Sequence, residues 1–209
     1  MYLSRIELDK TSRNVRLALA SPQRMHAIIA GCFDDLEVKQ RSLWRIDTID
    51  ENTYLLVFSM DIPDFNSLAD QFAINDDSKI ITKAYDSFLN GFECGETLRF
   101  RITANPSISK KNNTDPNNRG RVLGHITVDQ QKKWLEERSL KNGFELLSFD
   151  IVSRGEREFE RGSGIVTFTV ASYEGLIKIT DIKLFTYALA HGIGREKAYG
   201  CGLMTVARL

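Results

Sequence analysis

Apolar and polar residues alternate along this chain with two periods, near two residues in some segments and near three to four in others, which together predict an α+β fold. In the first half the predicted order is strand, helix, two strands, helix, strand. The segments are 2–8, a helix after Ser21, 44–50, 53–59, 63–72, and the strand-like stretches 80–89 and 97–103. The order βαββαβ is typical of the ferredoxin-like arrangement.

The helix after Ser21 has clear start signals. Ser21 is a favoured capping residue, and Pro22 occupies the first helical position, where a missing N–H costs nothing. Apolar residues then recur at helical spacing, at Met25, Ile28, Ile29, Cys32 and Phe33. This spacing predicts one inward-facing stripe.

The second half repeats the same order imperfectly. Residues 105–121 are basic and rich in Asn, so we expect a mobile loop or linker. A helix at 129–142, stopped by Gly143, precedes strands at 145–153, 165–172 and 176–180, with the charged segment 154–164 between the first two. A helix at 181–191 and a strand at 203–207 close the chain, and the inward helix residues are Leu184, Phe185, Ala188 and Leu189. We therefore expect two tandem ferredoxin-like domains, residues 1–104 and 122–209, joined by 105–121.

Composition favours a globular protein of the cytoplasm. The chain is 42% hydrophobic and 27% charged, which is ordinary for such proteins. No apolar run reaches the length of a membrane span, and the N-terminus lacks a signal-peptide pattern, so no membrane partner is expected. Cys32, Cys94 and Cys201 stand at no metal-like spacing, which argues against a disulfide framework or a zinc site.

Charge is distributed unevenly along a chain whose formal net charge is zero. Residues 1–33 carry five basic and two acidic groups, residues 34–96 carry five and fourteen, and residues 97–209 carry eighteen and twelve. A polyanion needs only a local basic field within a Debye length. Nucleic acid therefore remains a candidate ligand for the two ends of the chain, and the acidic middle is an unlikely RNA face.

The C-terminus contains a glycine-rich loop. Gly192, Gly194, Gly200 and Gly202 flank the cations Arg195 and Lys197 just before an apolar strand. Closely spaced glycines allow backbone N–H groups to turn toward an anion such as phosphate. The spacing matches neither the dinucleotide fingerprint nor a Walker motif, so from spacing alone a tight helix-to-strand connection is an equal alternative.

Three sequence blocks carry a family resemblance. The ending Gly-Ile-Gly, a basic residue, and Gly-Cys-Gly-Leu resembles the glycine-rich loop of the RAMP superfamily of CRISPR-associated proteins. With the opening Met-Tyr-Leu-Ser-Arg and the central Leu-Arg-Phe-Arg-Ile-Thr-Ala-Asn-Pro, the chain resembles the CasE subgroup, endoribonucleases that process CRISPR precursor RNA in subtype I-E systems. The resemblance implies two ferredoxin-like domains and a place among the subunits of the Cascade complex.

The histidines are the main candidates for catalysis. No pair of them stands at metal-ligand spacing and no acidic cluster suggests a two-metal nuclease, so we expect a metal-independent reaction without cofactors. RNA supplies its own nucleophile, the 2′-hydroxyl, and histidine is suited to remove its proton near neutral pH. His26 lies near a helix start at the edge of the apolar stripe, where a purely structural role is the alternative.

The resemblance assigns the catalytic role to His26 and leaves one departure. His26 matches the family's catalytic histidine, but relatives often carry tyrosine where this chain has Gln23. Gln23 can orient a phosphate or hydroxyl but cannot supply a proton as a phenol can. His191, at the end of the last helix, is the catalytic rival, and a local helix-end role is its alternative. His125 follows the basic loop and is a candidate for surface contact or solvation.

Two further basic sets are candidates for RNA binding. In 154–164, Arg154 shares one face of an extended segment with Glu156, Glu158 and Glu160, and Arg157 and Arg161 share the other. A salt-bridged solvent hairpin is the alternative to RNA contact. The second set lies in the Asn-rich loop and comprises Lys110, Lys111, Arg119 and Arg121. In the resembling family, positive residues of this half hold an RNA hairpin stem.

These observations predict an endoribonuclease. The resemblance to the CasE subgroup implies an enzyme that binds the CRISPR repeat hairpin and cuts once at the 3′ base of the stem. Such an enzyme leaves a 2′,3′-cyclic phosphate and a 5′-hydroxyl, and it retains the mature CRISPR RNA within Cascade. The first alternative is a RAMP scaffold that binds RNA without cutting it, which the glutamine at position 23 keeps open. The second is a ferredoxin-like regulatory domain for a small anionic metabolite.

Overall fold

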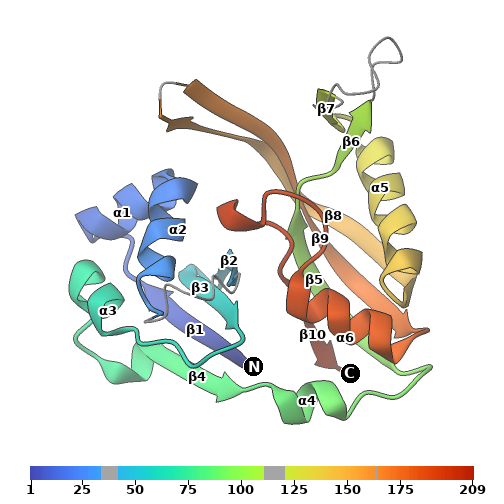
Figure 1. Cartoon of the computed structure of the whole chain (residues 1–209), viewed down its shortest axis with the longest axis horizontal. Helices are drawn as coiled ribbons and strands as arrows, with labels where there is room; N and C mark the ends of the chain where they lie inside the picture. Colours follow the sequence, from blue (N-terminus) through green and yellow to red (C-terminus); the bar gives the residue numbers. More distant parts are fainter. Residues whose placement is uncertain (34–41, 111–120, 163) are drawn as a thin grey trace.

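The first half folds around a four-stranded antiparallel sheet. The computed structural model describes residues 1–33, 42–110, 121–162 and 164–209. Strands β1 (Tyr2–Leu8), β2 (Leu43–Ile49), β3 (Asn52–Ser59) and β4 (Ile80–Ala84) lie in the order β2-β3-β1-β4. Helices α1 (Arg13–Ala20), α2 (Pro22–Ala30) and α3 (Asn66–Phe72) complete this unit (Figure 1). The order confirms the ferredoxin-like expectation.

Local sequence signals explain several of these elements. Ser21 caps α2 by accepting a hydrogen bond from the backbone N–H of Arg24 at 3.3 Å, as its residue type predicts. Asp50 and Glu51 form the two-residue turn between β2 and β3 with φ of 46° and 71°, the left-handed pair that suits the twist of a hairpin. Met25, Ile29 and Cys32 are buried in the core between helices and sheet, and burial raises the pKa of the Cys32 thiol to about 12.

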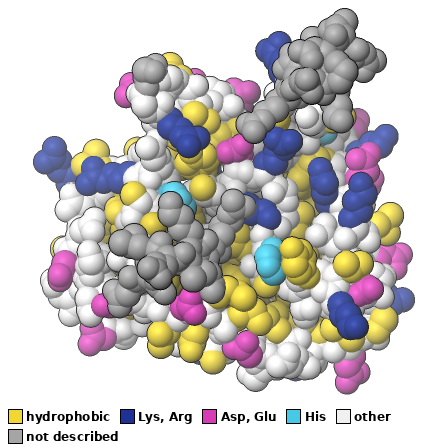
Figure 2. Space-filling model, in the orientation of Figure 1, with side chains coloured by type: hydrophobic (Ala, Val, Ile, Leu, Met, Phe, Trp, Pro, Cys, Tyr) yellow, Lys and Arg dark blue, Asp and Glu magenta, His cyan; other side chains and the backbone are white. Residues whose placement is uncertain are grey.

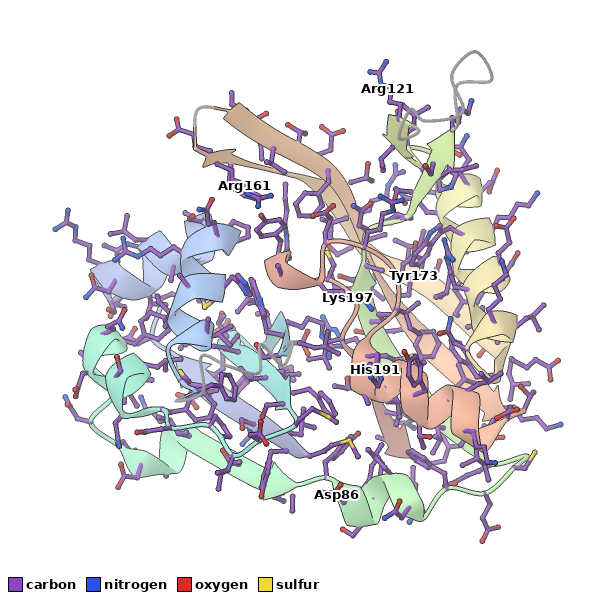
Figure 3. All side chains as sticks on the ribbon, in the orientation of Figure 1. Asp86, Arg121, Arg161, Tyr173, His191 and Lys197 are labelled. Atoms are coloured by element: carbon purple, nitrogen blue, oxygen red, sulfur yellow. The ribbon has the colours of Figure 1, made fainter. Side chains whose placement is uncertain are left out.

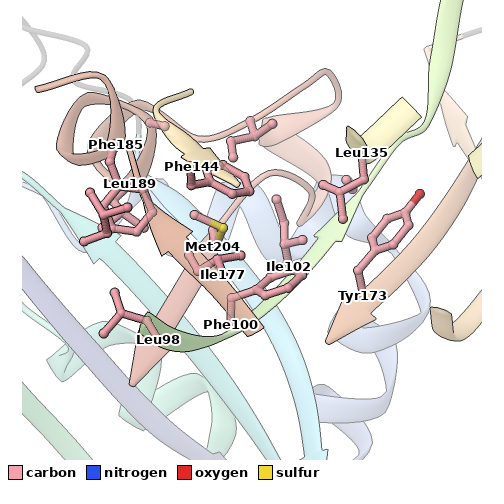
Figure 4. Close-up of a cluster of buried hydrophobic side chains, with 14 of the residues drawn as sticks. Leu98, Phe100, Ile102, Leu135, Phe144, Tyr173, Ile177, Phe185, Leu189 and Met204 are labelled. Carbon is pink, nitrogen blue, oxygen red and sulfur yellow. The ribbon is translucent and has the colours of Figure 1, made fainter. Parts of the chain in front are cut away.

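The second half has the same topology. Strands β5 (Thr97–Ala104), β8 (Phe144–Arg161), β9 (Gly164–Ile179) and β10 (Met204–Arg208) lie in the order β10-β5-β9-β8, and α5 (Val128–Lys141) and α6 (Ile182–His191) belong to this unit. Their shared core contains Phe100, Ile102, Tyr173, Phe185 and Met204 (Figure 4). A capping box at Thr127 and Gln130 fixes the start of α5.

Two hairpins extend beyond this second sheet. The short one consists of β6 (Ser107–Lys110) and β7 (Arg121–Gly124). The long one is the continuation of β8 and β9, strands of 18 and 16 residues, which reaches toward α1 and α2 (Figure 1). The short helix α4 (Asp86–Asn90) lies between the two sheets along the chain, and the 3-10 turns η1 (Asp77–Lys79) and η2 (Lys197–Tyr199) complete the described elements. No helix within the described ranges is both long and apolar enough to span a membrane.

The structure corrects several sequence-based boundaries. Strand β5 pairs with β9 and β10, so residues 97–104 belong to the second sheet. The predicted domain limits 1–104 and 122–209 had assigned these residues to the first domain. Part of 105–121 is β-structure rather than loop, and its residues 111–120 lie outside the described ranges. Segment 154–164 is mostly strand. The predictions missed α1 entirely.

One inward assignment is also wrong. Phe185, Ala188 and Leu189 are buried as expected, but Leu184 is 46% exposed. The buried residues of α6 define a face that Leu184 only borders, because successive helical residues lie about 100° apart.

Candidate functional site

Helix α2 carries the histidine that the sequence singled out. His26 follows the buried Met25, and its own side chain is half-buried. Gln23 and Arg24 in the first turn are exposed, and that turn contains no acidic residue. The helix start therefore presents unopposed N–H dipoles and a cation, an arrangement that favours an approaching phosphate.

The glycine-rich loop is packed between the two halves. Gly200 has φ of 77°, and a Cβ there would lie 2.7 Å from the ring of Trp44 on β2. Gly192 ends α6 with φ of 73°, and its Cβ would lie 2.9 Å from the Leu43 side chain. Both positions require glycine because of conformation and close approach. Gly194 faces Trp134 and Gly202 faces Ile193 in the same manner, so close packing accounts for all four glycines.

The two loop cations differ in their surroundings. Lys197 donates from Nζ to the carbonyl oxygen of His191 at 2.6 Å and so ties the loop to the end of α6 (Figure 3). Arg195 is exposed. Arg195 is therefore the loop residue whose charge faces solvent most directly.

His191 takes part in contacts within its own helix. Its Nδ1 lies 3.0 Å from the carbonyl oxygen of Tyr187, and the two rings stack with centroids 3.8 Å apart. These contacts fit the helix-end role better than a catalytic one. His125 is half-buried, and its backbone N–H donates to the carbonyl of Pro106.

The loop and the long hairpin both meet α2. Turn η2 packs against α2, β8 packs against α2 as well, and the Trp44 indole donates to the carbonyl oxygen of Ala198 in η2 at 3.1 Å. Arg157 donates to the carbonyl oxygen of Tyr199 at 2.5 Å. The phenyl ring of Phe159 lies 4.6 Å from the ring of Tyr199. Three segments that are distant in sequence thus meet at one place.

The arginines of β8 alternate as the sequence predicted. The register from 154 to 161 is unbroken, so Arg157 and Arg161 share one face while Arg154 shares the other with the glutamates. Arg157 is committed to Tyr199, and Arg154 donates to the carbonyl oxygen of Ile126 at 3.2 Å. Arg161 is exposed on the part of the hairpin that reaches over α2 (Figure 3). Because its guanidinium is exposed, Arg161 is a candidate for contact with RNA on this side of the molecule.

The short hairpin carries the second basic set. Lys110 and Arg121 are exposed and paired across β6 and β7, and Lys111 and Arg119 lie outside the described residues. On the face shown in Figure 2, basic side chains gather in the upper part, whereas many acidic ones lie along the lower edge. This distribution matches the uneven charge along the sequence, and it gives the upper part of this face more cations with which to attract a polyanion.

A buried ion pair that the sequence analysis missed joins the two halves. Arg45 on β2 is 1% exposed and binds Asp47 through two hydrogen bonds of 2.8 and 2.7 Å. It also donates to the carbonyls of Arg101 and Leu203 and to the hydroxyl of Thr205, at 2.8 to 2.9 Å, all in the second half. One side chain of the first sheet is thereby held by β5 and β10. The bonds to the second half are made between residues distant in the chain, so the only local signal was a charged pair inside an apolar strand.

The described residues contain no group of three His, Cys, Asp or Glu side chains that could hold a metal ion.

Comparison with known proteins identifies a matching family model and a related protein. Residues 1–208 match the family model described as CRISPR associated protein. The chain is 26% identical over 223 residues to the CRISPR-associated endoribonuclease Cse3 of Thermus thermophilus, covering 99% of this chain and 100% of that protein.

Solved structures agree. A CRISPR endoribonuclease Cse3 bound to a 19-nucleotide RNA superposes with a TM-score of 0.80 at 26% identity, over 99% of this chain and 100% of that chain. A chain of a CRISPR RNA-guided surveillance complex in a pre-nicking state shares the fold, with a TM-score of 0.68 at 23% identity and full coverage of both chains. Because the family model covers almost the whole sequence, this chain belongs to the family of CRISPR-associated proteins.

Proposed function

We propose that this chain is an endoribonuclease that processes CRISPR precursor RNA in the cytoplasm. It binds the repeat hairpin, cuts at the 3′ base of the stem and remains on the mature CRISPR RNA as a Cascade subunit. The observation that carries the proposal is the meeting of η2 and the arginine-bearing β8 at the helix of His26. The likeness to an RNA-bound endoribonuclease over the whole chain supports it.

His26 is the general base in this proposal. It removes the proton of the 2′-hydroxyl, and the resulting oxygen forms a bond to the adjacent phosphorus. The bond between phosphorus and the 5′-oxygen then breaks, which yields a 2′,3′-cyclic phosphate and, after protonation, a 5′-hydroxyl. The start of α2 and Arg161 would stabilise the charge that develops on the phosphoryl oxygens.

Binding residues divide according to their present contacts. Lys110, Arg121, Arg161 and Arg195 are exposed and would meet phosphates directly, with Arg154 as a further contact. Lys197 and Arg157 already bind backbone carbonyls and would hold the loop and hairpin in position. An RNA stem is recognised mainly by shape and phosphates, which suits such a scattered basic surface.

The proposal is tested by incubating the protein with the repeat RNA of its own locus in a chelator and analysing the product ends. We expect one cut, with a cyclic phosphate and a 5′-hydroxyl. Activity that is lost in chelator and restored by magnesium, with the RNA fold unchanged, contradicts the metal-independent mechanism.

A non-catalytic RNA-binding scaffold is the second candidate. Gln23 favours it, because this exposed side chain cannot donate a proton to the leaving 5′-oxygen. A cognate hairpin that the protein binds but never cuts would support the scaffold over the endoribonuclease. Gln23→Tyr is then the first variant to test for cleavage.

A further inference from the structure

A cavity separates the two halves next to α2. It has a volume of about 640 Å³ and lies between the adjoining ends of α1 and α2, strand β2, and the β5, β8 and β9 strands of the second sheet. Small-molecule sites generally span about 300–1,000 Å³, so the interdomain cavity is large enough for one nucleotide unit.

The walls of the interdomain cavity differ in chemistry. One wall, from the first half, is apolar and includes Leu19, Met25, Trp44 and Ile46. The opposite wall, from the second half, is polar and includes Ser153, Arg154, Glu156 and Ser172. A flat group with an apolar face and a polar edge fits between two such walls, because its face can stack while its edge forms hydrogen bonds.

Charge in the interdomain cavity disfavours a phosphate. Three arginines line the cavity: Arg101 is held by Asp47 at 3.3 Å and by Glu174 at 2.9 Å, while Arg154 and Arg157 each donate to a backbone carbonyl. Glu156 and Glu158 line the same wall and would repel an anion. A neutral group with hydrogen-bond donors, such as a nucleobase, therefore suits Glu156 and Glu158 on this wall better than a phosphate does.

Some polar groups of this wall are available. In the part of the chain that the structure describes, no hydrogen bond or ion pair is recorded for the side chains of Ser153 and Glu156. Thr103 and Ser172 already bond to each other at 2.7 Å. A carboxylate only accepts hydrogen bonds, so Glu156 selects a base edge that carries an amino group.

We propose that the interdomain cavity binds one unpaired nucleobase of the RNA, with an exocyclic amino group facing Glu156, so that adenine, cytosine or guanine is preferred over uracil. This inference rests on the proposed function. The base packs against the apolar wall, and its nucleotide is one that flanks the hairpin stem, since α2 borders both this cavity and the proposed cleavage site.

The test combines abasic RNA with a variant that fills the cavity. Repeat RNAs with a single abasic site at each unpaired position are titrated against the wild type and against Ser153→Trp. We expect one position at which the abasic site weakens wild-type affinity by about tenfold, the loss expected when a base no longer buries apolar surface against this wall. Ser153→Trp should bind intact RNA about tenfold more weakly than the wild type does. The abasic site at that position should not weaken the affinity of Ser153→Trp any further.

Val152→Trp is the matched control, since its side chain is exposed on the same strand outside the cavity lining. It should bind intact RNA normally and keep the sensitivity of the wild type to the abasic site. If the abasic sites reduce the affinity of Ser153→Trp and of the wild type equally at every position, the inference is overturned. Binding and cleavage of the intact hairpin would still support the proposed function. Failure of the wild type to bind the intact repeat overturns the proposed function itself.

Discussion

The two halves of this molecule share one topology and differ in what is added to it. Strand order β2-β3-β1-β4 in the first sheet corresponds to β10-β5-β9-β8 in the second. The first half keeps strands of five to eight residues and carries the candidate base on α2. The second half adds a short basic hairpin, an 18-residue strand and the glycine-rich loop. This difference fits the proposal that the first half supplies the catalytic histidine and the second half holds RNA.

Removing the proposed general base, His26, should have the largest effect on the cleavage rate. His26→Ala is expected to slow cleavage by at least about a hundredfold, the lower range for general-base catalysis, while hairpin affinity persists. Single-turnover rates and a binding titration measure both. Alanine is a strong helix former, so α2 should remain folded.

His191→Ala is the matched control. The His191 ring contacts Tyr187 of its own helix, and the bond from Lys197 goes to the backbone carbonyl of His191, which alanine keeps. It should retain most activity. If His191→Ala is inactive and His26→Ala cuts normally, the catalytic residue lies in the second half and the division of roles is wrong.

Breaking the link between the halves should have the next largest effect. Arg45→Ala leaves Asp47 buried without its main partner, which typically costs about 3–5 kcal/mol of unfolding free energy. Denaturant unfolding measures the loss. Thr205→Val removes only one of the bonds and should cost about 1 kcal/mol. A loss below about 1 kcal/mol for Arg45→Ala would show that the halves are joined by other contacts.

Crowding the glycine-rich loop should have a smaller effect. Gly200→Ala places a Cβ against the Trp44 ring at a left-handed residue, so unfolding free energy should fall by about 1–3 kcal/mol. Gly162→Ala is the control, since it has φ of 61° but nothing within 4 Å of the added atom. Equal losses in both variants would attribute the cost to backbone conformation alone and remove the packing argument.

The smallest effect should come from the short hairpin. Replacing both Lys110 and Arg121 by alanine removes two exposed charges and should weaken RNA binding at low salt without changing the cleavage rate of saturated enzyme. The slope of log affinity against log salt should fall by about one to two units. An unchanged slope would show that this hairpin does not approach the phosphates.

Local sequence signals predicted much of the fold, but they did not predict which segments distant in sequence pack together. The capped start of α2 depends on neighbouring residues alone, and it was predicted from them. Helix α1 was missed because only Val15 and Ala18 of its eight residues are buried, too few for a periodic stripe. Strand β5 was recognised as a strand, but no local pattern specifies which sheet a strand joins.

The candidate site follows the same rule. His26 and the glycine-rich loop could be singled out from residue type and resemblance. That η2 and β8 both pack on α2 depends on contacts across more than a hundred residues of chain, which no spacing reveals. That Arg157 binds the carbonyl of Tyr199 likewise depends on how two separate segments fold together.

The central claim is that this chain directs the RNA's own 2′-hydroxyl against the scissile phosphate. The most direct measurement uses a repeat hairpin whose nucleotide just 5′ of the cut is deoxy, compared with the all-ribose hairpin for binding and single-turnover cleavage. We expect the deoxy hairpin to bind almost as tightly and to remain uncut. Cleavage of the deoxy hairpin at the normal rate would contradict the account and identify water as the nucleophile.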